Sequence, residues 1–272
     1  SSPRPRPRSS AEIRAGDPAG SNPYDGFARD YHWLYDDVHL RLGTATPGVR
    51  AALHGLETGA RVLDAACGVG LDAIALRRRG FRVTAVDASP AMLDEARRRL
   101  RAAACDVHPA ACTWDELPTR FAGDAFDAVL CTGNSIAHLH SEEEMVSVFR
   151  SFAGVLAPDG VVIVDTHHWE EMERIGDHVL VDPVVVERNG ATCLRTYTWR
   201  RAEHEGGRPW RLDLGLEISR ADGHEERHLE VELYPFSVDE LRDRLRASGF
   251  THISIDATPE DDRYTAVARR AA

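Results

Sequence analysis

The chain has 272 residues and a formal net charge of −11, and all 33 of its basic residues are arginine. This acidic balance argues against a nucleic-acid partner, which would need a clustered basic face, and the lack of lysine excludes a Schiff-base mechanism. Five cysteines without a CxxC pair disfavour disulfides and a metal site, and no apolar run approaches the roughly 20 residues that span a bilayer. We therefore expect a cytoplasmic protein that binds neither nucleic acid nor membrane.

The first 58 residues divide into two parts. Residues 1–21 are rich in proline and arginine at their start, which predicts a flexible tail. The segment Tyr24–Leu42 carries aromatic side chains at roughly helical spacing, and Val49–Leu56 is typical of a short helix. Residues 22–58 are therefore expected to form an N-terminal helical cap.

Strands and helices alternate along the next segment, residues 59–178. The predicted elements are, in chain order, the strand Arg61–Asp64, the helix Leu71–Arg79, the strand Phe81–Val86, the helix Met92–Ala103, the strand Phe126–Cys131, the helix Glu142–Leu156 and the strand Val161–Asp165. Ser89 before Pro90 is a helix-start pattern. The alternation predicts an α/β fold with a doubly wound, Rossmann-like sheet.

The pattern changes after Asp165. Four stretches separated by glycine-containing turns predict antiparallel strands: Val179–Glu187, Thr192–Arg200, Arg211–Ser219 and Arg227–Tyr234. Residues 179–234 are therefore expected to form an inserted antiparallel β lid.

The last segment, residues 235–272, is predicted to return to the α/β core. Ser237 and Glu240 form a capping-box pattern for the helix Ser237–Ser248. A strand hairpin, Phe250–Asp256 and Tyr264–Arg269, is expected to follow it.

The first strand-to-helix turn carries the clearest ligand signal. Asp64 ends a buried strand, Gly68 and Gly70 follow it, and Asp87 ends the next strand, where its carboxylate can accept both hydroxyls of a ribose. A dinucleotide site would need a third glycine and a helix start open to pyrophosphate, but Asp72 places an anion there. A ligand with an amino-acid end and a nucleoside fits better, which indicates S-adenosylmethionine.

Longer motifs resemble the glycine N-methyltransferase-like family of class I S-adenosylmethionine-dependent methyltransferases. The first two units read RVLDAACGVGLDAIALRRRGFRVTAVDASPAMLDEA (residues 61–96), and residues 126–139 read FDAVLCTGNSIAHL, with the Gly-Asn-Ser box of that family. Similar steps follow at residues 156–165 and 233–235, and Tyr24, Gly26 and Trp33 fit an N-terminal pattern that covers the cofactor. The resemblance implies a seven-stranded sheet and S-adenosylmethionine as cofactor.

The resemblance also implies where the cofactor binds. Asp64, Ala66 and Gly68 should line its methionine end, while Asp87, Ala88 and Met92 should hold the ribose. Trp114 should pack on the adenine beside Thr113, which replaces an amide side chain. The remaining expected cofactor contacts are Tyr24, Trp33, Cys131, Thr132 and Gly133.

On the substrate side, the resemblance assigns catalytic roles to Asn134 and His138. The family has an arginine after the fifth strand that pairs with the carboxylate of glycine, whereas this chain has His167 at that position, followed by His168. A neutral imidazole cannot make a bidentate pair with a carboxylate. The substrate therefore carries no carboxylate, or Arg188 or Arg195 supplies the charge.

Three functions follow from these observations. The first is methyl transfer to the nitrogen of a small amino acid or related amine. The second is O- or C-methylation in a specialised-metabolite pathway, with His138, His167 or His168 as base. The third is a non-catalytic S-adenosylmethionine-binding protein. The resemblance further suggests a homo-oligomer.

Overall fold

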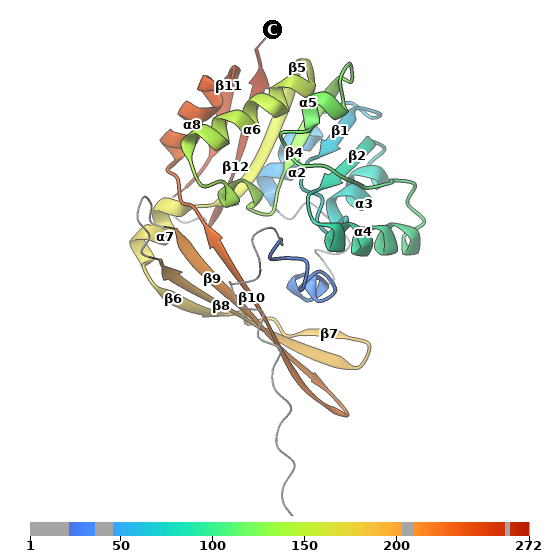
Figure 1. Cartoon of the computed structure of the whole chain (residues 1–272), viewed down its shortest axis with the longest axis vertical. Helices are drawn as coiled ribbons and strands as arrows, with labels where there is room; N and C mark the ends of the chain where they lie inside the picture. Colours follow the sequence, from blue (N-terminus) through green and yellow to red (C-terminus); the bar gives the residue numbers. More distant parts are fainter. Residues whose placement is uncertain (1–21, 36–45, 203–208, 259–261, 272) are drawn as a thin grey trace, which may run out of the picture.

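The computed structural model describes residues 22–35, 46–202, 209–258 and 262–271, and its strands form two sheets. The first has seven strands in the order β11-β12-β5-β4-β1-β2-β3, and the second has the order β10-β9-β8-β6, with β7 also paired to β8 (Figure 1). The predicted tail, residues 1–21, and the predicted turn at 206–207 lie outside the described residues. No helix in the described part of the chain is long and apolar enough to cross a membrane.

The seven-stranded sheet is mainly parallel. Its strands are β1 (Arg61–Asp64), β2 (Arg82–Asp87), β3 (Ala110–Ala111), β4 (Phe126–Cys131), β5 (Leu156–His167), β11 (Phe250–Asp256) and β12 (Arg263–Arg270). The first five run parallel, β12 pairs antiparallel with β5, and β11 pairs antiparallel with β12. The strand order reverses between β1 and β4, and ligands of such sheets bind beyond the carboxyl ends of the strands at this point.

Helices cover both faces of this sheet because its central strands are apolar on both sides. Val62, Leu130 and Ile163 pack with side chains of α2 (Pro47–His54) and α3 (Leu71–Arg78). The alternate residues Leu63 and Val129 belong to the cluster on the opposite face. The helices contributing to that cluster are α5 (Leu117–Arg120), α6 (Glu142–Val155) and α8 (Val238–Ala247), while α4 (Pro90–Ala102) packs beside α3.

Two predicted helix starts are confirmed. The Ser89 hydroxyl accepts the Met92 N–H at 3.1 Å before α4. Ser237 and Glu240 form the complete capping box of α8. Both caps satisfy N–H groups that a helix leaves without partners.

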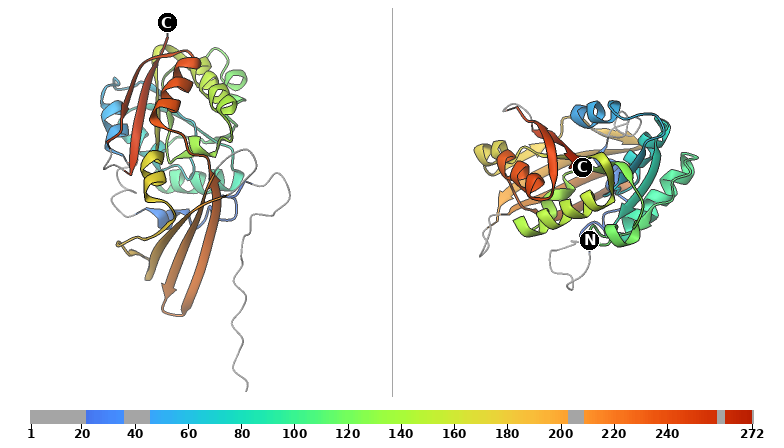
Figure 2. Two further views of the ribbon diagram at one scale, coloured as in Figure 1. Left: turned by 90° about the vertical axis from the view of Figure 1, so that its left-hand side faces the viewer. Right: turned by 90° about the horizontal axis from the view of Figure 1, so that it is seen from above.

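The second sheet is entirely antiparallel. Its strands are β6 (His178–Val181), β7 (Val186–Arg188), β8 (Ala191–Arg201), β9 (Trp210–Arg220) and β10 (Gly223–Leu233). The segment 22–35 lies between the two sheets (Figures 1 and 2). Arg195 of β8 donates to the Leu34 carbonyl at 2.9 Å, and Asp25 accepts from the Ser89 hydroxyl at 2.5 Å. The segment is thus attached to β8 of the second sheet and to the N-cap of α4 beside the first sheet.

The structure corrects three predicted elements. The strand expected at Val179–Glu187 is divided into β6 and β7, because Pro183 has no N–H and the Asp182 carboxylate accepts the Val184 N–H. The aromatic segment from Tyr24 forms turns and one 3₁₀ helix, η1 (Tyr31–Leu34), rather than a long helix; residues 36–42 lie outside the described part. Strand β5 begins at Leu156, five residues before its predicted start at Val161.

Several short elements were not predicted, because two to seven residues carry too little periodicity. They are β3, α5, η2 (Ser135–His138) and α7 (Trp169–Ile175). The division into tail, cap, core and lid at residues 21, 58, 178 and 234 stays a prediction.

Candidate active site

The end of β1 holds a buried carboxyl group without a hydrogen-bond partner. Asp64 is fully buried, and neither of its carboxylate oxygens has a partner within the described residues. Its pKa lies well above the ordinary value because of burial and then the nearby charges of Asp72 and Asp87; the Ala66 N–H opposes this rise without making a hydrogen bond of normal geometry. Buried polar groups normally have partners, so a cationic ligand group fits this position.

The turn after β1 leaves room for a ligand. Asp87 of β2 accepts the Gly68 N–H at 2.8 Å and the Ser89 N–H at 2.9 Å, which fixes the turn. Burial is the main cause of the raised pKa of Asp87. Gly68 has φ +49° and a Cβ there would meet nothing within 4 Å, whereas a Cβ on Gly70 would lie 3.2 Å from that of Ala96. Gly70 serves packing, and Gly68 faces open space.

The predicted ribose contacts surround Asp87. Ala88 follows it and is exposed. Met92 is buried with Ala28 of the N-terminal segment, and Tyr24 packs against this cluster. The structure therefore places Ala88 and Met92 near the end of β2, and contact of either residue with a ribose stays a prediction.

Trp114 has a structural bond that the sequence did not indicate. Its indole N–H donates to the Ala65 carbonyl at 2.7 Å, and its ring meets Phe152 edge-on at 5.9 Å. Trp114 thus ties the end of β1 to the core while remaining partly exposed. Thr113 is exposed, and its N–H donates to Glu116 at 2.8 Å. Adenine contact by either residue stays a prediction.

The turn after β4 is held by side chains from two other elements, α3 and β5. Cys131 is buried, and the Thr132 hydroxyl donates to Asp72 at 2.8 Å. The Gly133 N–H donates to Asp165 at 2.6 Å. A Cβ on Gly133, which has φ +70°, would meet nothing within 4 Å. This turn therefore presents backbone to open space at the strand-order reversal.

Asn134 connects this turn to the end of β5. It is 5% exposed and has φ +65°, a left-handed conformation that asparagine tolerates better than most residues. Its side-chain oxygen accepts the Thr166 hydroxyl at 2.8 Å and the His167 N–H at 3.1 Å. Asn134 therefore has a demonstrable positioning role, and its predicted substrate contact stays a prediction.

The N-terminal segment contributes a tyrosine to the site. The Tyr24 hydroxyl lies 3.0 Å from Nε2 of His138. Burial, and then the charge of His140, lower the pKa of His138 to about 4, although an interaction with the Glu232 backbone acts to raise it. Trp33, by contrast, is 3% exposed and lies under the guanidinium of Arg188 at 5.8 Å, so its ring is used for packing.

Two further tyrosines face the carboxyl ends of the strands. The hydroxyls of Tyr31 and Tyr35 lie 3.5 Å apart. Burial is the main cause of the raised pKa of each tyrosine, and the negative charge of Asp87 also acts to raise the pKa of Tyr31. Segment 22–35 therefore covers the edge where the predicted cofactor residues lie.

The sequence reading missed Arg263, which lies opposite His167 in the pairing of β12 with β5. Its Nε and Nη2 donate to one carboxylate oxygen of Asp165 at 3.0 and 2.7 Å, and its Nη1 lies 3.5 Å from Nε2 of His167. An arginine thus lies beside the position from which the family arginine is missing, but it comes from another strand and its charge is balanced by Asp165.

The adjacent histidines have different surroundings. Burial, and then the charge of Arg263, lower the pKa of His167 to about 3, although an interaction with the Asp262 backbone acts to raise it. His168 instead packs edge-on against Tyr264 at 5.7 Å and lies 3.3 Å from Glu170. Only His167 of this pair is beside Arg263, so the structure does not bring His168 to the same group.

Arg188 and Arg195, the two other candidate cations, already have partners. Arg188 donates to the carbonyls of His32 and Tyr35. Arg195 pairs with Asp182 at 2.8 Å and donates to backbone carbonyls. Both fix the N-terminal segment or the sheet edge.

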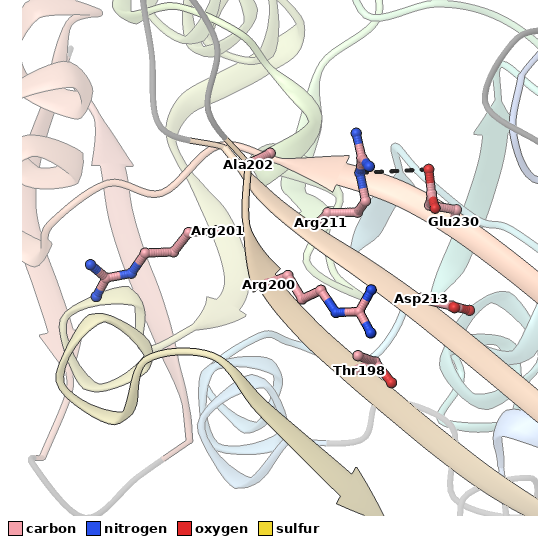
Figure 3. Close-up of a pocket in the computed structure, with 7 residues that line it drawn as sticks. All are labelled: Thr198, Arg200, Arg201, Ala202, Arg211, Asp213 and Glu230. Carbon is pink, nitrogen blue, oxygen red and sulfur yellow. Dashed lines mark ion pairs between the residues drawn. The ribbon is translucent and has the colours of Figure 1, made fainter.

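A separate hollow of about 350 Å³ lies on the outer face of the antiparallel sheet (Figure 3). Arg200, Arg211, Asp213 and Glu230 are among its lining residues, and none of the predicted site residues is. Arg200, which lines the hollow, follows Trp199 along β8, so the two side chains point to opposite faces of the sheet. The ring centroid of Trp199 lies 5.1 Å from that of His167. The candidate active site is therefore at the carboxyl ends of β1, β2, β4 and β5 and not in this hollow.

The Asp165–Arg263 pair yields a prediction on stability. Arg263→Met should lower the free energy of unfolding by about 3 kcal/mol, because it leaves the Asp165 carboxylate buried without its partner. The double variant with Asp165→Asn should lose less than the single variant, since the amide keeps an oxygen for the Gly133 N–H. Urea unfolding of the four proteins measures the coupling. Additive losses would mean that the pair is not coupled.

The lowered pKa values yield a prediction on acid stability. Unfolded imidazoles bind protons below about pH 6.5, whereas folded His138 and His167 resist protonation down to about 4 and about 3. These two histidines therefore leave the free energy of unfolding unchanged above about pH 6.5. Below that pH, the free energy of unfolding falls by about 1.4 kcal/mol per pH unit for each group. His167→Gln should show a shallower fall in urea unfolding at several pH values. His54→Gln, at an exposed position, should match the wild type; equal slopes in all three would contradict the assignment.

Comparisons with known proteins identify the family. A methyltransferase-domain family matches residues 62–160. The chain is 31% identical over 199 residues to the glycine/sarcosine N-methyltransferase of Aphanothece halophytica, a match that covers 73% of this chain and 69% of that protein.

Two solved structures are similar over most of the chain. An amino pentose methyltransferase from Micromonospora echinaspora, solved with bound S-adenosylmethionine, has a TM-score of 0.69 and 26% identity, covering 90% of this chain and 97% of that one. A sugar N-methyltransferase from Streptoalloteichus shares the fold, with a TM-score of 0.65, 23% identity and coverage of 98% and 100%. The chain therefore belongs to the glycine N-methyltransferase-like family of class I S-adenosylmethionine-dependent methyltransferases.

Proposed function

We propose that this methyltransferase acts on the nitrogen of a small hydroxylated amine without a carboxylate, of the amino-sugar class. The observation that carries the proposal is the balanced charge of Arg263, whose guanidinium is held by Asp165 beside His167. The cytoplasmic location and the lack of a nucleic-acid partner stay predictions from the sequence.

The residues present fit S-adenosylmethionine. Asp64 would hold the ammonium of the methionine end, because its buried carboxyl has no partner in the described protein. Gly68 would allow close approach, and Asp87 would hold the ribose. The cofactor supplies a methyl group that its sulfonium already activates; the protein has to hold the acceptor nitrogen in line with it and exclude water.

A neutral amine is the acceptor that requires least of the protein. Such a nitrogen would attack the activated methyl group with its own lone pair and would release its proton to water afterwards, so the protein would not have to supply a strong base. His138 and His167 are neutral at pH 7 because burial lowers their pKa values, so neither supplies a charge that would select a carboxylate. The Tyr31 hydroxyl, which accepts from Tyr35, can donate its own hydrogen to a hydroxyl oxygen. These groups suit a hydroxylated acceptor.

The partners of the three arginines support an acceptor without a carboxylate. The glycine/sarcosine relative favours an amino-acid acceptor, but a carboxylate in this pocket would have to replace Asp165 on Arg263 or the backbone carbonyls on Arg188 and Arg195. The similarity to the amino pentose methyltransferase, over 90% of this chain, favours the amino-sugar class.

The two alternatives are less well supported. O-methylation of an alcohol needs a base whose pKa lies near the working pH. Burial instead lowers the pKa of His138 to about 4 and that of His167 to about 3. A protein that only binds the cofactor would not need open space at both Gly68 and Gly133; product formation tests this alternative directly.

The proposal predicts which acceptors are used. Release of S-adenosylhomocysteine should occur with an amino hexose or amino pentose, and should be absent with glycine and sarcosine. Asp64→Asn should lower affinity for S-adenosylmethionine at least tenfold in calorimetry, since a charge-assisted bond is worth more than about 1.4 kcal/mol.

Arg200→Gln, on the far face of the antiparallel sheet, is the matched control and should retain wild-type turnover. Faster turnover of glycine than of any amino sugar would contradict the acceptor class. Cofactor binding without product from any amine or alcohol would favour the non-catalytic alternative.

A further inference from the structure

The exposed large hydrophobic side chains of the described residues are gathered at one edge of the antiparallel sheet. They all lie within residues 175–185: Ile175, Val179, Leu180, Val181, Val184 and Val185, between 47% and 63% exposed. We call this set the β6 patch. Its centre is strand β6, which ends the strand order β10-β9-β8-β6 (Figure 1). A large exposed apolar patch on an otherwise acidic protein marks an interaction surface.

The backbone of β6 can pair with a further strand. On its inner side β6 pairs with β8, and Asp182 N–H donates to the Arg195 carbonyl at 2.9 Å. Because hydrogen-bonding residues alternate in an antiparallel ladder, the N–H and C=O groups of Val179 and Val181 point away from β8. No strand in the described part of the chain pairs with this side.

We propose that the β6 patch binds a second copy of this chain by antiparallel pairing of β6 with β6, with a two-fold axis at Leu180. Val179 of each copy then lies opposite Val181 of the other, and these two pairs exchange four backbone hydrogen bonds. Leu180 meets Leu180 on the axis. The interface is isologous and closed, as in most homodimers.

The sequence of the edge favours a second copy and fixes its register. With the axis at Leu180, the apolar residues Val179, Leu180 and Val181 all lie opposite apolar residues of the second copy. An axis at Val179 would place Leu180 opposite His178, and an axis at Val181 would place Leu180 opposite Asp182, whose carboxylate already pairs with Arg195. Of these three, only the Leu180 axis matches apolar with apolar residues throughout.

The first test exploits the predicted pairing of Val179 with Val181. Wild-type protein should sediment at twice the mass of the chain and shift toward the monomer on dilution. Val179→Lys with Val181→Lys opposes like charges and should abolish the dimer at every concentration. Val179→Lys with Val181→Glu opposes unlike charges and should restore a dimer that weakens in salt.

Both side chains point to solvent, so both double variants should keep the wild-type thermal midpoint and cofactor affinity. A wild-type protein that stays monomeric at all concentrations would overturn the proposal. Equal dimerisation of the two double variants would place the interface elsewhere and would overturn it too.

The second test examines the axis itself. Residues opposite each other at a position without hydrogen bonds have Cα atoms about 4.5 Å apart, within the range that a disulfide bridges. Leu180→Cys should therefore form a covalent dimer on oxidation. Val179→Cys should not form one, because in this register the Val179 positions of the two copies are offset by two residues. Cross-linking of Val179→Cys but not of Leu180→Cys would contradict the register.

Discussion

The structure depends on a carboxyl group that the protein itself leaves unsatisfied. Asp64 ends the first strand of the sheet at the point where the strand order reverses, is fully buried, and has Asp72 and Asp87 as charged neighbours. Such a group destabilises a protein unless a ligand offsets it. The Asp87–Gly68 bond and the Thr132–Asp72 bond hold the backbone around the same space open. The predicted cofactor residues Asp64, Gly68 and Asp87 therefore lie together at one edge of the sheet.

The acceptor side is organised around a second carboxylate, which does have partners. Asp165 joins the Gly133 N–H to the Arg263 guanidinium, and Asn134 joins the same turn to β5. The Arg263 guanidinium lies next to His167, but the Asp165 carboxylate balances its charge. In the proposed function, His167 at the position of the family's arginine, together with the neutralised Arg263, would favour an acceptor without a carboxylate.

The sequence predicted what depends on local patterns. Strand–helix alternation, the helix caps at Ser89 and Ser237 and the Asp64–Gly68 turn all involve residues close together in the chain. Arg263 could not be found in this way, because it lies 98 residues from Asp165 and meets it only through the register of β12 on β5. The bond of Trp114 to Ala65 likewise depends on a tertiary contact. The division of the predicted strand, by contrast, arises from the local sequence Asp182–Pro183–Val184 and could have been predicted. The sequence also could not indicate that Trp33 is almost fully buried or that His168 packs against Tyr264, because both depend on tertiary packing; their predicted roles stay predictions.

The most direct test of the central claim is the number of protons released when S-adenosylmethionine binds. Titration calorimetry near pH 6 in buffers with different ionisation enthalpies measures this number. The raised pKa of Asp64 means that its carboxyl takes up protons more readily in the free protein, and a bound ammonium group should lower that pKa. We predict proton release by the wild type and none by Asp64→Asn. Binding without proton release in the wild type, or equal release in both proteins, would contradict the account.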